Sequence, residues 1–330
     1  QPQAGNPRPR IFRLPADRAI INRSGLNNKG LYKAIAQLRH RHDRLIIGGN
    51  IGKNTLTQPS QVAADYLKMF RNLYQYVDYF SINACCDNCA DGSVSHNKAH
   101  LMNILQPLFD FRRGQNQYRP IMLKVSPDMS DEVIDEISDI LLETPLDGIV
   151  ATNGTHRREG LHTSHMALDK IGSGRLSGAP LTQRAVEVVR RIHTRSGGNF
   201  PIIGVGGITR GTDAWNKLEA GATLVQVYSG LVFRGPGLIG DVADACQYYY
   251  EQNPDKRVFK RVVPVTAEAP ETVSDPATAE GAPATAAPGE LAISLDEPDQ
   301  PQGVAPEQAT DSAADATPAV LRSDTSPGQP

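Results

Sequence analysis

Six short runs of apolar residues recur through the middle of the chain, and amphipathic stretches separate them. Several runs are nearly continuous in isoleucine, valine and leucine, which is typical of parallel strands covered on both faces. The runs are Leu45–Ile51, Val77–Ala84, Ile121–Val125, Gly148–Ala151, Ile202–Val205 and Thr223–Tyr228. This repeated strand–helix alternation predicts a parallel α/β architecture.

The stretches between the runs carry helical periodicity. In residues 60–77 and 131–142, apolar residues recur on one face at spacings of three and four. Ser130 is a natural N-cap for the second of these helices, and Asp131 and Glu132 suit the positive end of its dipole. Further helices are predicted at His96–Phe111, Thr182–His193, Thr212–Ala220 and Leu238–Tyr250.

Polar residues or glycines stand at the carboxyl end of nearly every predicted strand. They are Asn50, Asn83, Lys124, Thr152 with Asn153, Gly206 with Gly207, and Tyr228 with Ser229. Enzymes built on a (β/α)₈ barrel gather their sites on this face. We therefore predict a (β/α)₈ TIM barrel with about six of its eight strands present, and a doubly wound sheet is the alternative.

The first 28 residues have a different pattern and do not resemble two more βα units. Arg10–Leu14 and Ala19–Asn22 predict a hairpin that is joined at Pro15–Asp17 and followed by the loop Arg23–Asn28. We assign residues 1–28 to this hairpin and loop, and residues 29–255 to the barrel portion.

The C-terminal region is acidic and rich in proline and alanine. From Arg261 onward there are 2 basic and 12 acidic residues, 11 of the 24 prolines, and no Phe, Tyr or Trp. Such a segment cannot bury enough apolar surface to offset its chain entropy. We predict that residues 263–330 form a disordered tail, which leaves residues 1–260 with a net charge of about +8.

Composition gives indications of the cellular location of the chain and of its ligands. No apolar run reaches the roughly 18 residues that a membrane-spanning helix needs, and residues 1–13 are too polar for a signal peptide. Cys85, Cys86 and Cys89 crowd together far from Cys246, which is a poor disulfide framework and favours a reducing, intracellular location. The positive excess suits an anionic ligand, an anionic membrane surface or an ordinary solvated face.

Cys86 is the residue with the most specific signal of a chemical role in the sequence. It lies three residues beyond Asn83, at the end of a predicted strand, and Asn88 follows two residues later. An exposed thiol at a barrel mouth, near a cation such as Lys124, can act as a general base or nucleophile. A buried structural cysteine and a zinc site are the alternatives, although the three cysteines lack the usual paired spacing of zinc ligands. We predict no metal site.

Lys124 and two glycine segments are candidates for holding an anion or a carbonyl substrate. A lysine inside a strand can form a Schiff base or hold an anionic cofactor by its charge. Residues 204–208 (GVGGI) and 228–230 (YSG) follow the last two predicted strands, where barrels commonly bind phosphate. Neither segment fits the G-x-G-x-x-G pattern of a dinucleotide fold. His162 and His165 have no obvious carboxylate or cysteine companion, so we predict that both lie at the surface.

Taken together, these segments resemble dihydroorotate dehydrogenase over roughly residues 1–250. The matching stretches are INRSGLNNKG (21–30), GGNIGKN (48–54), DYFSINACCDN (78–88), LKVSPD (123–128), DGIVATNGT (147–155), GRLSGAPL (174–181), IIGVGGI (202–208) and LVQVYSG (224–230). The hairpin and the ending YSGLVFRGPGLI look most like the membrane-associated, quinone-reducing class.

The resemblance implies an FMN cofactor and a dihydroorotate site. It implies FMN contacts at Asn50, Asn83, Lys124, Thr152, Gly178, Gly207, Tyr228 and Ser229. It implies dihydroorotate contacts at Asn22, Arg23, Ser24, Gly25, Leu26, Asn83, Asn88, Asn153 and Gly154. Cys86 falls where the family keeps the base that removes the C5 proton, while hydride passes from C6 to flavin N5. Asparagines suit the amide-like edges of a pyrimidine.

The chain departs from the family pattern at several positions. Cys86 is typical of the soluble class, whereas the quinone class usually has serine there. The other changes are Asp87 for proline, Cys89 for threonine or valine, Ser24 for methionine, Arg175 for glycine and Gly154 for threonine. The family's first two strands have no counterpart here, which suggests a fragment whose activity on its own is in question.

The expected function is therefore oxidation of dihydroorotate to orotate in pyrimidine biosynthesis, with quinone as the final electron acceptor and no nucleic-acid partner. By resemblance the protein is peripheral to the inner membrane, or cytoplasmic if the docking segment is absent. The alternatives are an inactive fragment, a related FMN-dependent pyrimidine oxidoreductase, a Schiff-base aldolase that uses Lys124, and a non-catalytic remnant whose tail acts as a tether.

Overall fold

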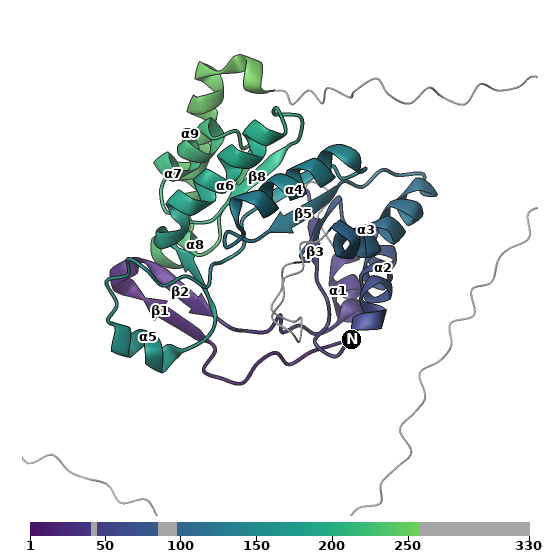
Figure 1. Ribbon diagram of the computed structural model, residues 1–330, viewed down its shortest axis with the longest axis horizontal. Helices are drawn as coiled ribbons and strands as arrows, with labels where there is room; N and C mark the ends of the chain where they lie inside the picture. Colours follow the sequence, from purple (N-terminus) through teal and green to yellow (C-terminus); the bar gives the residue numbers. More distant parts are fainter. Residues whose placement is uncertain (41–44, 85–97, 258–330) are drawn as a thin grey trace, which may run out of the picture. The chain divides into compact units, whose positions relative to one another are not determined.

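A six-stranded parallel sheet forms the centre of the fold (Figure 1). The computed structural model describes residues 1–40, 45–84 and 98–257. The strands, in spatial order, are β3 (Gly48–Ile51), β4 (Tyr79–Ile82), β5 (Ile121–Val125), β6 (Gly148–Ala151), β8 (Ile202–Val205) and β9 (Leu224–Gln226). Each lies within one of the predicted runs, and their order in the sheet follows the chain. A doubly wound sheet would reverse that order at a switch point, so the single direction supports the barrel.

Helices connect these strands as the periodicity predicts. The predicted helices are α2 (Val62–Leu73), α3 (Lys98–Arg113), α4 (Asp131–Glu143), α6 (Thr182–Arg195), α7 (Gly211–Glu219) and α9 (Gly237–Gln252). Shorter helices are α1 (Leu31–Leu38), α5 (His165–Ile171) and α8 (Gly230–Arg234), and single 3₁₀ turns occupy Pro15–Asp17, Pro59–Gln61, Ala179–Leu181 and Pro254–Arg257. The Ser130 hydroxyl accepts a hydrogen bond from the Val133 amide at 3.5 Å, which confirms the N-cap of α4.

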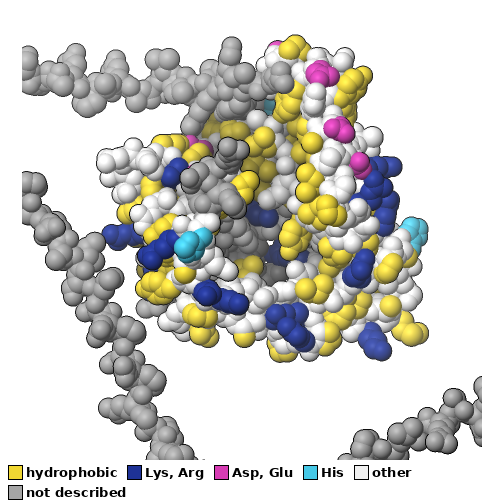
Figure 2. All heavy atoms as spheres, turned by 180° about the vertical axis from the view of Figure 1, so that it is seen from behind, with side chains coloured by type: hydrophobic (Ala, Val, Ile, Leu, Met, Phe, Trp, Pro, Cys, Tyr) yellow, Lys and Arg dark blue, Asp and Glu magenta, His cyan; other side chains and the backbone are white. Residues whose placement is uncertain are grey.

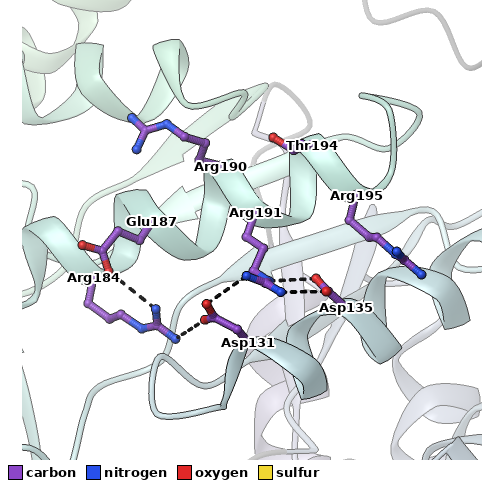
Figure 3. A pocket seen from close by; sticks show the side chains of 8 residues that line it. All are labelled: Asp131, Asp135, Arg184, Glu187, Arg190, Arg191, Thr194 and Arg195. Carbon is purple, nitrogen blue, oxygen red and sulfur yellow. Dashed lines mark hydrogen bonds and ion pairs between the residues drawn. The ribbon is translucent and has the colours of Figure 1, made fainter.

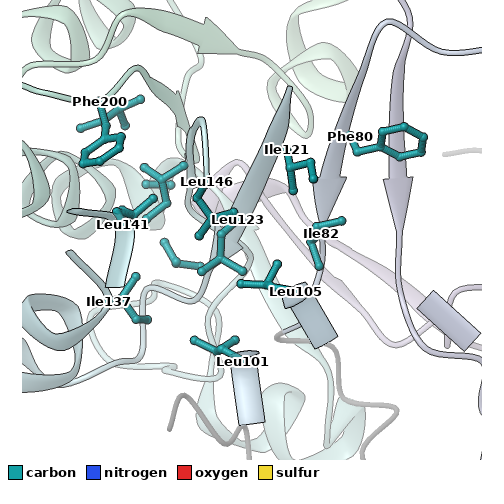
Figure 4. Close-up of a cluster of buried hydrophobic side chains, with 14 of the residues drawn as sticks. Phe80, Ile82, Leu101, Leu105, Ile121, Leu123, Ile137, Leu141, Leu146 and Phe200 are labelled. Carbon is teal, nitrogen blue, oxygen red and sulfur yellow. The ribbon is translucent and has the colours of Figure 1, made fainter. Parts of the chain in front are cut away.

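The main hydrophobic core lies between the sheet and the helices that cover its outer face. Figure 4 shows Ile82 from β4 and Leu123 from β5 packed among side chains of α3 and α4, including Leu105 and Ile137. These side chains are at most 1% exposed. Burial of this kind contributes about 1.5–3 kcal/mol to stability for each large aliphatic side chain. The packing of the helices on the outer face therefore stabilises the parallel sheet.

A second sheet joins the predicted hairpin to a strand that the sequence did not reveal. It consists of β1 (Ile11–Leu14), β2 (Ala19–Asn22) and β7 (Arg175–Gly178), all antiparallel in the order β1-β2-β7. Residues 175–178 have the sequence RLSG, which carries no strand signal of its own. The strand forms because β2 supplies its hydrogen-bond partners. Hairpin and barrel portion therefore share one sheet.

Asp17 fastens the hairpin to the segment before α5. Its buried carboxylate accepts hydrogen bonds from the backbone N–H groups of His162 (2.6 Å) and Thr163 (3.1 Å) and from the Thr163 hydroxyl. Burial raises the pKa of Asp17, but the hydrogen bonds from Thr163 and His162 outweigh that effect and hold the pKa below its ordinary value. The charged carboxylate therefore stabilises this contact.

We expect Asp17→Asn to lower the free energy of unfolding by about 1–3 kcal/mol at pH 7, because an amide NH₂ would face hydrogen-bond donors. The stabilisation from Asp17 is present above the unfolded pKa near 3.9 and is lost as pH falls through the lower folded pKa. Urea unfolding at pH 7 and near pH 3 measures this difference, with Asp169→Asn on the exposed face of α5 as the control. A variant as stable as the parent at pH 7 would contradict the role of Asp17.

A shallow depression between α4 and α6 is filled by ion pairs. Figure 3 shows Arg191 between Asp131 and Asp135, and Arg184 reaching Asp131. The Arg191 guanidinium contacts Asp135 through two hydrogen bonds of 2.8 and 2.7 Å. Because these partly exposed charges already satisfy one another, the depression is a seam between two helices and not a ligand site.

Candidate active site

A large cavity of about 1140 Å³ lies along the inner face of the parallel sheet, includes the carboxyl ends of its strands and extends to the second sheet. It is lined by every predicted site residue that the structure describes. These are Asn22, Arg23, Ser24, Gly25, Leu26, Asn50, Asn83, Lys124, Thr152, Asn153, Gly154, Gly178, Gly207, Tyr228 and Ser229. The predicted base Cys86 and the predicted substrate contact Asn88 fall in the range 85–97, beyond what the structure describes.

The strands present alternate residues to the cavity and to the helices. On β4, Tyr79 and Ser81 line the cavity whereas Phe80 and Ile82 lie in the outer core. Lys124 on β5 follows the same rule, because its neighbours Leu123 and Val125 are in the core. The pleat of a strand directs successive side chains to opposite faces. A strand-end polar residue is thereby fixed on the inner side.

Two asparagines from different strands meet in the cavity wall. The Asn153 side-chain N–H donates to the Oδ1 atom of Asn83 at 3.0 Å. Asn83 is 7% exposed, and its backbone carbonyl accepts a hydrogen bond from the Tyr66 hydroxyl at 2.9 Å. The backbone N–H of Asn153 donates to the Val125 carbonyl at 2.8 Å. The backbone of both residues is thus held by the barrel framework and their side chains hold each other, and such amide groups can donate to and accept from a polar heterocycle.

The glycine loop after β8 packs tightly against the start of α6. Gly207 has φ +75°, and a Cβ atom there would lie 2.4 Å from the backbone nitrogen of Thr182. The Thr182 hydroxyl also donates to the Gly207 carbonyl at 2.8 Å. Only glycine permits this conformation together with this close approach. Gly178 has a similar constraint at φ +111°, where a Cβ would lie 2.3 Å from the Arg18 carbonyl. Exposed backbone N–H groups of such loops suit phosphate.

The loop after β2 is braced from both sides. The Asn22 Oδ1 atom accepts hydrogen bonds from the Ser24 N–H (2.8 Å) and the Ser24 hydroxyl (2.6 Å). The Arg23 guanidinium donates to the Ser173 carbonyl at 2.8 Å and lies over the Phe12 ring at 4.6 Å from its centroid. These contacts hold residues 22–26 at the edge of the cavity.

The charged side chains that line the described part of the cavity are all basic. They are Arg23, Lys124 and Arg175, with His156 beside them, and none of the lining residues in the described ranges is Asp or Glu. Figure 2 shows a hollow with Lys and Arg side chains around it on the reverse face. A cavity with glycine-rich edges, amide side chains and basic groups favours anionic ligands that carry phosphate or carboxylate. These features fit the predicted flavin nucleotide.

Sequence reasoning did not identify Arg175 and Ser177 as site residues. Both lie on β7 and face the cavity, and the Ser177 hydroxyl is 2.6 Å from the Ser229 hydroxyl. Their spacing of two would have placed them on one face, but only if RLSG had been recognised as a strand. His162 and His165 are exposed, as predicted, and do not line the cavity.

Across residues 1–40, 45–84 and 98–257, no three His, Cys, Asp or Glu side chains gather closely enough to hold a metal ion. In the same ranges, no helix is long and apolar enough to cross a bilayer.

Comparisons with known proteins agree on one family. The dihydroorotate dehydrogenase family model matches residues 1–247. A curated dihydroorotate dehydrogenase (quinone) of Christiangramia forsetii is 43% identical over 242 residues, which are 73% of this chain and 70% of that protein. One from Corynebacterium efficiens is 42% identical over 241 residues, covering 73% of this chain and 63% of that protein.

Solved structures give the same result. A crystal structure of an Eimeria tenella DHODH in complex with ferulenol superposes with a TM-score of 0.70 at 32% identity, and the match covers 77% of this chain and 73% of that one. The ligand-free form from the same organism gives a TM-score of 0.70 at 33% identity, covering 77% and 76%. The chain spans about two thirds of the length of the curated relatives it matches.

Proposed function

This chain belongs to the dihydroorotate dehydrogenase family, and we propose that it oxidises dihydroorotate to orotate with FMN as hydride acceptor and a quinone as final acceptor. Membership confirms the predicted family, its barrel fold and its flavin chemistry. The observation that carries the proposal for this chain is the single basic cavity in which all described site residues meet. Bound FMN would supply a two-electron acceptor inside it.

FMN is proposed to lie against the strand ends and the glycine loops. The proposed contacts are Asn50, Asn83, Lys124, Thr152, Gly178, Gly207, Tyr228 and Ser229, which all line the cavity. Gly207 lines the cavity and has no side chain, so the backbone of this loop could approach the phosphate closely. The Lys124 ammonium lies on the inner face of β5, where it would stabilise negative charge that develops on the flavin ring.

Dihydroorotate is proposed to bind beside the asparagine pair and the loop of residues 22–26. The side-chain amides of Asn83 and Asn153 are held by each other, so both are placed together to hydrogen bond to the ring edges of a pyrimidine. Gly154 and Asn88 complete the proposed set, of which Asn88 falls within the undescribed range. In this arrangement residues 1–28 contribute the substrate loop and residues 29–255 the FMN site.

Cys86 is the proposed base. Its thiolate would take the C5 proton of dihydroorotate as hydride leaves C6, and the C5–C6 double bond forms between the two carbons. The reduced cofactor would pass its electrons to a quinone, as the names of the curated relatives indicate for those proteins. Because quinones reside in bilayers, we place the protein inside the cell at the periphery of the inner membrane.

The test is a visible absorbance spectrum of the purified chain, followed by anaerobic addition of dihydroorotate. We expect a bound flavin band that bleaches on addition of dihydroorotate. A chain that takes up no FMN on reconstitution, or whose Lys124 is trapped by borohydride with a carbonyl substrate, would contradict the proposal.

Cys86→Ala separates binding from chemistry. We expect this variant to keep its flavin band and to bind orotate, while dihydroorotate bleaches the band about 10²- to 10⁴-fold more slowly, which is the usual contribution of a general base. Cys86→Ser is the matched variant, since a hydroxyl can also accept the proton, and it should retain more activity than alanine. Equal rates in the parent and the alanine variant, measured by stopped-flow absorbance, would exclude Cys86 as the base.

A further inference from the structure

The loop after β6 carries two of the proposed substrate contacts along the edge of the cavity. Asn153, Gly154 and His156 line the cavity, whereas Thr155 between them is 6% exposed and does not. The Thr155 hydroxyl instead donates a hydrogen bond to the Asp128 carboxylate. Whatever holds Thr155 in place therefore also sets the position of the cavity residues on either side of it.

Asp128 holds this loop with both oxygens of its carboxylate. The Oδ1 atom accepts the hydrogen bond from the Thr155 hydroxyl, and the Oδ2 atom accepts one from the His156 backbone N–H at 2.8 Å. The Arg157 Nε atom lies 4.0 Å from Oδ1. Asp128 itself does not line the cavity. Its carboxylate is thus directed at consecutive residues of one loop, from behind the site.

Asp128 can act as an anchor because the backbone around it is held on both sides. The Arg184 guanidinium from α6 donates to the Pro127 carbonyl at 3.0 Å and to the Met129 carbonyl at 2.9 Å. The Asp128 backbone N–H donates to the Ser126 hydroxyl at 3.2 Å. The end of β5, the start of α6 and the loop after β6 are therefore connected around one carboxylate.

Gly154 increases the importance of this anchor. The backbone N–H of Asn153 is bonded to the end of β5 at 2.8 Å, and the Thr155 backbone exchanges hydrogen bonds of 2.9 and 2.7 Å with Leu176 of β7. The residue between these two held positions is a glycine, which has the widest choice of backbone conformations when it is not restrained. The Asp128 contact adds a restraint on the β5 side of the loop.

We propose that Asp128 is a positioning residue for the pyrimidine site, which fixes Asn153 and Gly154 through Thr155 and so raises the affinity for dihydroorotate and orotate. This assignment rests on the proposed function and adds to it a residue that lies outside the cavity. A loop that is already held in its binding conformation loses less entropy when the ligand binds, and the affinity is higher for that reason.

The effect should fall on the pyrimidine and not on the flavin. Thr152 is the one proposed FMN contact that adjoins the loop in the chain, and its backbone N–H donates to the Val205 carbonyl of β8 at 2.8 Å. That bond does not involve Asp128. A general loosening of the fold would weaken the binding of both ligands, so the two affinities together distinguish positioning from a merely structural role.

The experiment measures FMN and orotate binding by the full chain and by Thr155→Val, Thr155→Ser and Asp128→Asn. Flavin fluorescence gives the dissociation constant of FMN, and isothermal titration of the FMN-loaded protein gives that of orotate. We expect Thr155→Val and Asp128→Asn to weaken orotate binding by about 10-fold, the lower end for loss of a hydrogen bond to a charged group, and to leave FMN binding unchanged. Thr155→Ser keeps the hydroxyl and should bind orotate as the parent does. Combining Thr155→Val with Asp128→Asn should add no further loss, because both remove the same bond.

Thr163→Val is the matched control. The Thr163 hydroxyl also donates to a buried carboxylate, that of Asp17, but Thr163 does not line the cavity. This variant should lose stability and keep the orotate affinity of the parent. Unchanged orotate affinity in Thr155→Val, or equal losses of FMN and orotate affinity, would overturn the role of Asp128 alone. A parent chain that does not bind orotate would overturn the proposed function together with it.

Discussion

Gly207→Ala is expected to lose most of the chain's affinity for FMN and about 2–4 kcal/mol of stability, the combined cost of left-handed strain and overpacking. Gly207 has φ +75°, and the added methyl group would lie 2.3 Å from the Thr182 hydroxyl and 2.4 Å from the Thr182 backbone. Backbone at the start of α6 cannot yield as a flexible side chain can. The glycine loop must therefore move away from its observed position.

Gly240→Ala provides the control for this substitution. Gly240 lies in α9, and nothing lies within 4 Å of a Cβ atom added there. An alanine in an open helical position should raise stability by about 0.5–1 kcal/mol and leave FMN affinity unchanged. Flavin fluorescence titration and thermal unfolding measure both quantities. If Gly207→Ala bound FMN like the parent, the phosphate would have to be held elsewhere.

Lys217→Met is expected to raise the free energy of unfolding at pH 7 by up to about 3 kcal/mol, at 1.36 kcal/mol for each unit of pKa displacement. Lys217 on α7 is 0% exposed, and its ammonium has no hydrogen-bond partner among the described residues. Burial lowers the pKa of Lys217 to about 8, and the nearby Asp213 carboxylate offsets only part of this. Methionine has a similar length and carries no charge to bury.

The pH dependence of this effect follows from linkage. The unfolded chain holds the Lys217 proton up to about pH 10.4, whereas the folded chain releases it near pH 8. The unfolded state therefore binds more protons between these values, and the stability of the parent rises with pH across that window. The advantage of Lys217→Met should be full below pH 8 and shrink toward pH 10.4.

Urea unfolding at half-unit steps from pH 7 to pH 10.5 tests the prediction. Lys33→Met is the control, because Lys33 is exposed on α1 and its replacement should leave the slope of stability against pH unchanged. An unchanged slope in Lys217→Met would show that the buried ammonium is solvated in the folded chain.

The chain itself determined the parallel sheet and most of the site. Local signals sufficed for these parts, because a strand buried on both faces needs a continuous apolar run and a covering helix needs a stripe at spacings of three and four. The strand-end rule also predicted where four site residues lie, namely Asn50, Asn83, Lys124 and Thr152. The carboxyl ends of parallel strands meet on one face of a barrel, so residues near these ends lie close together. Their common cavity follows from that rule.

Only the tertiary structure decided the features that depend on partners distant in sequence. Residues 175–178 became a strand because β2 lies beside them, and that pairing turned Arg175 toward the asparagine pair. Lys217 has the sequence pattern of an ordinary helical lysine, yet it is completely buried, and its stem lies beside Gly204 of β8. Burial and hydrogen bonding arise between segments, so no local pattern records them.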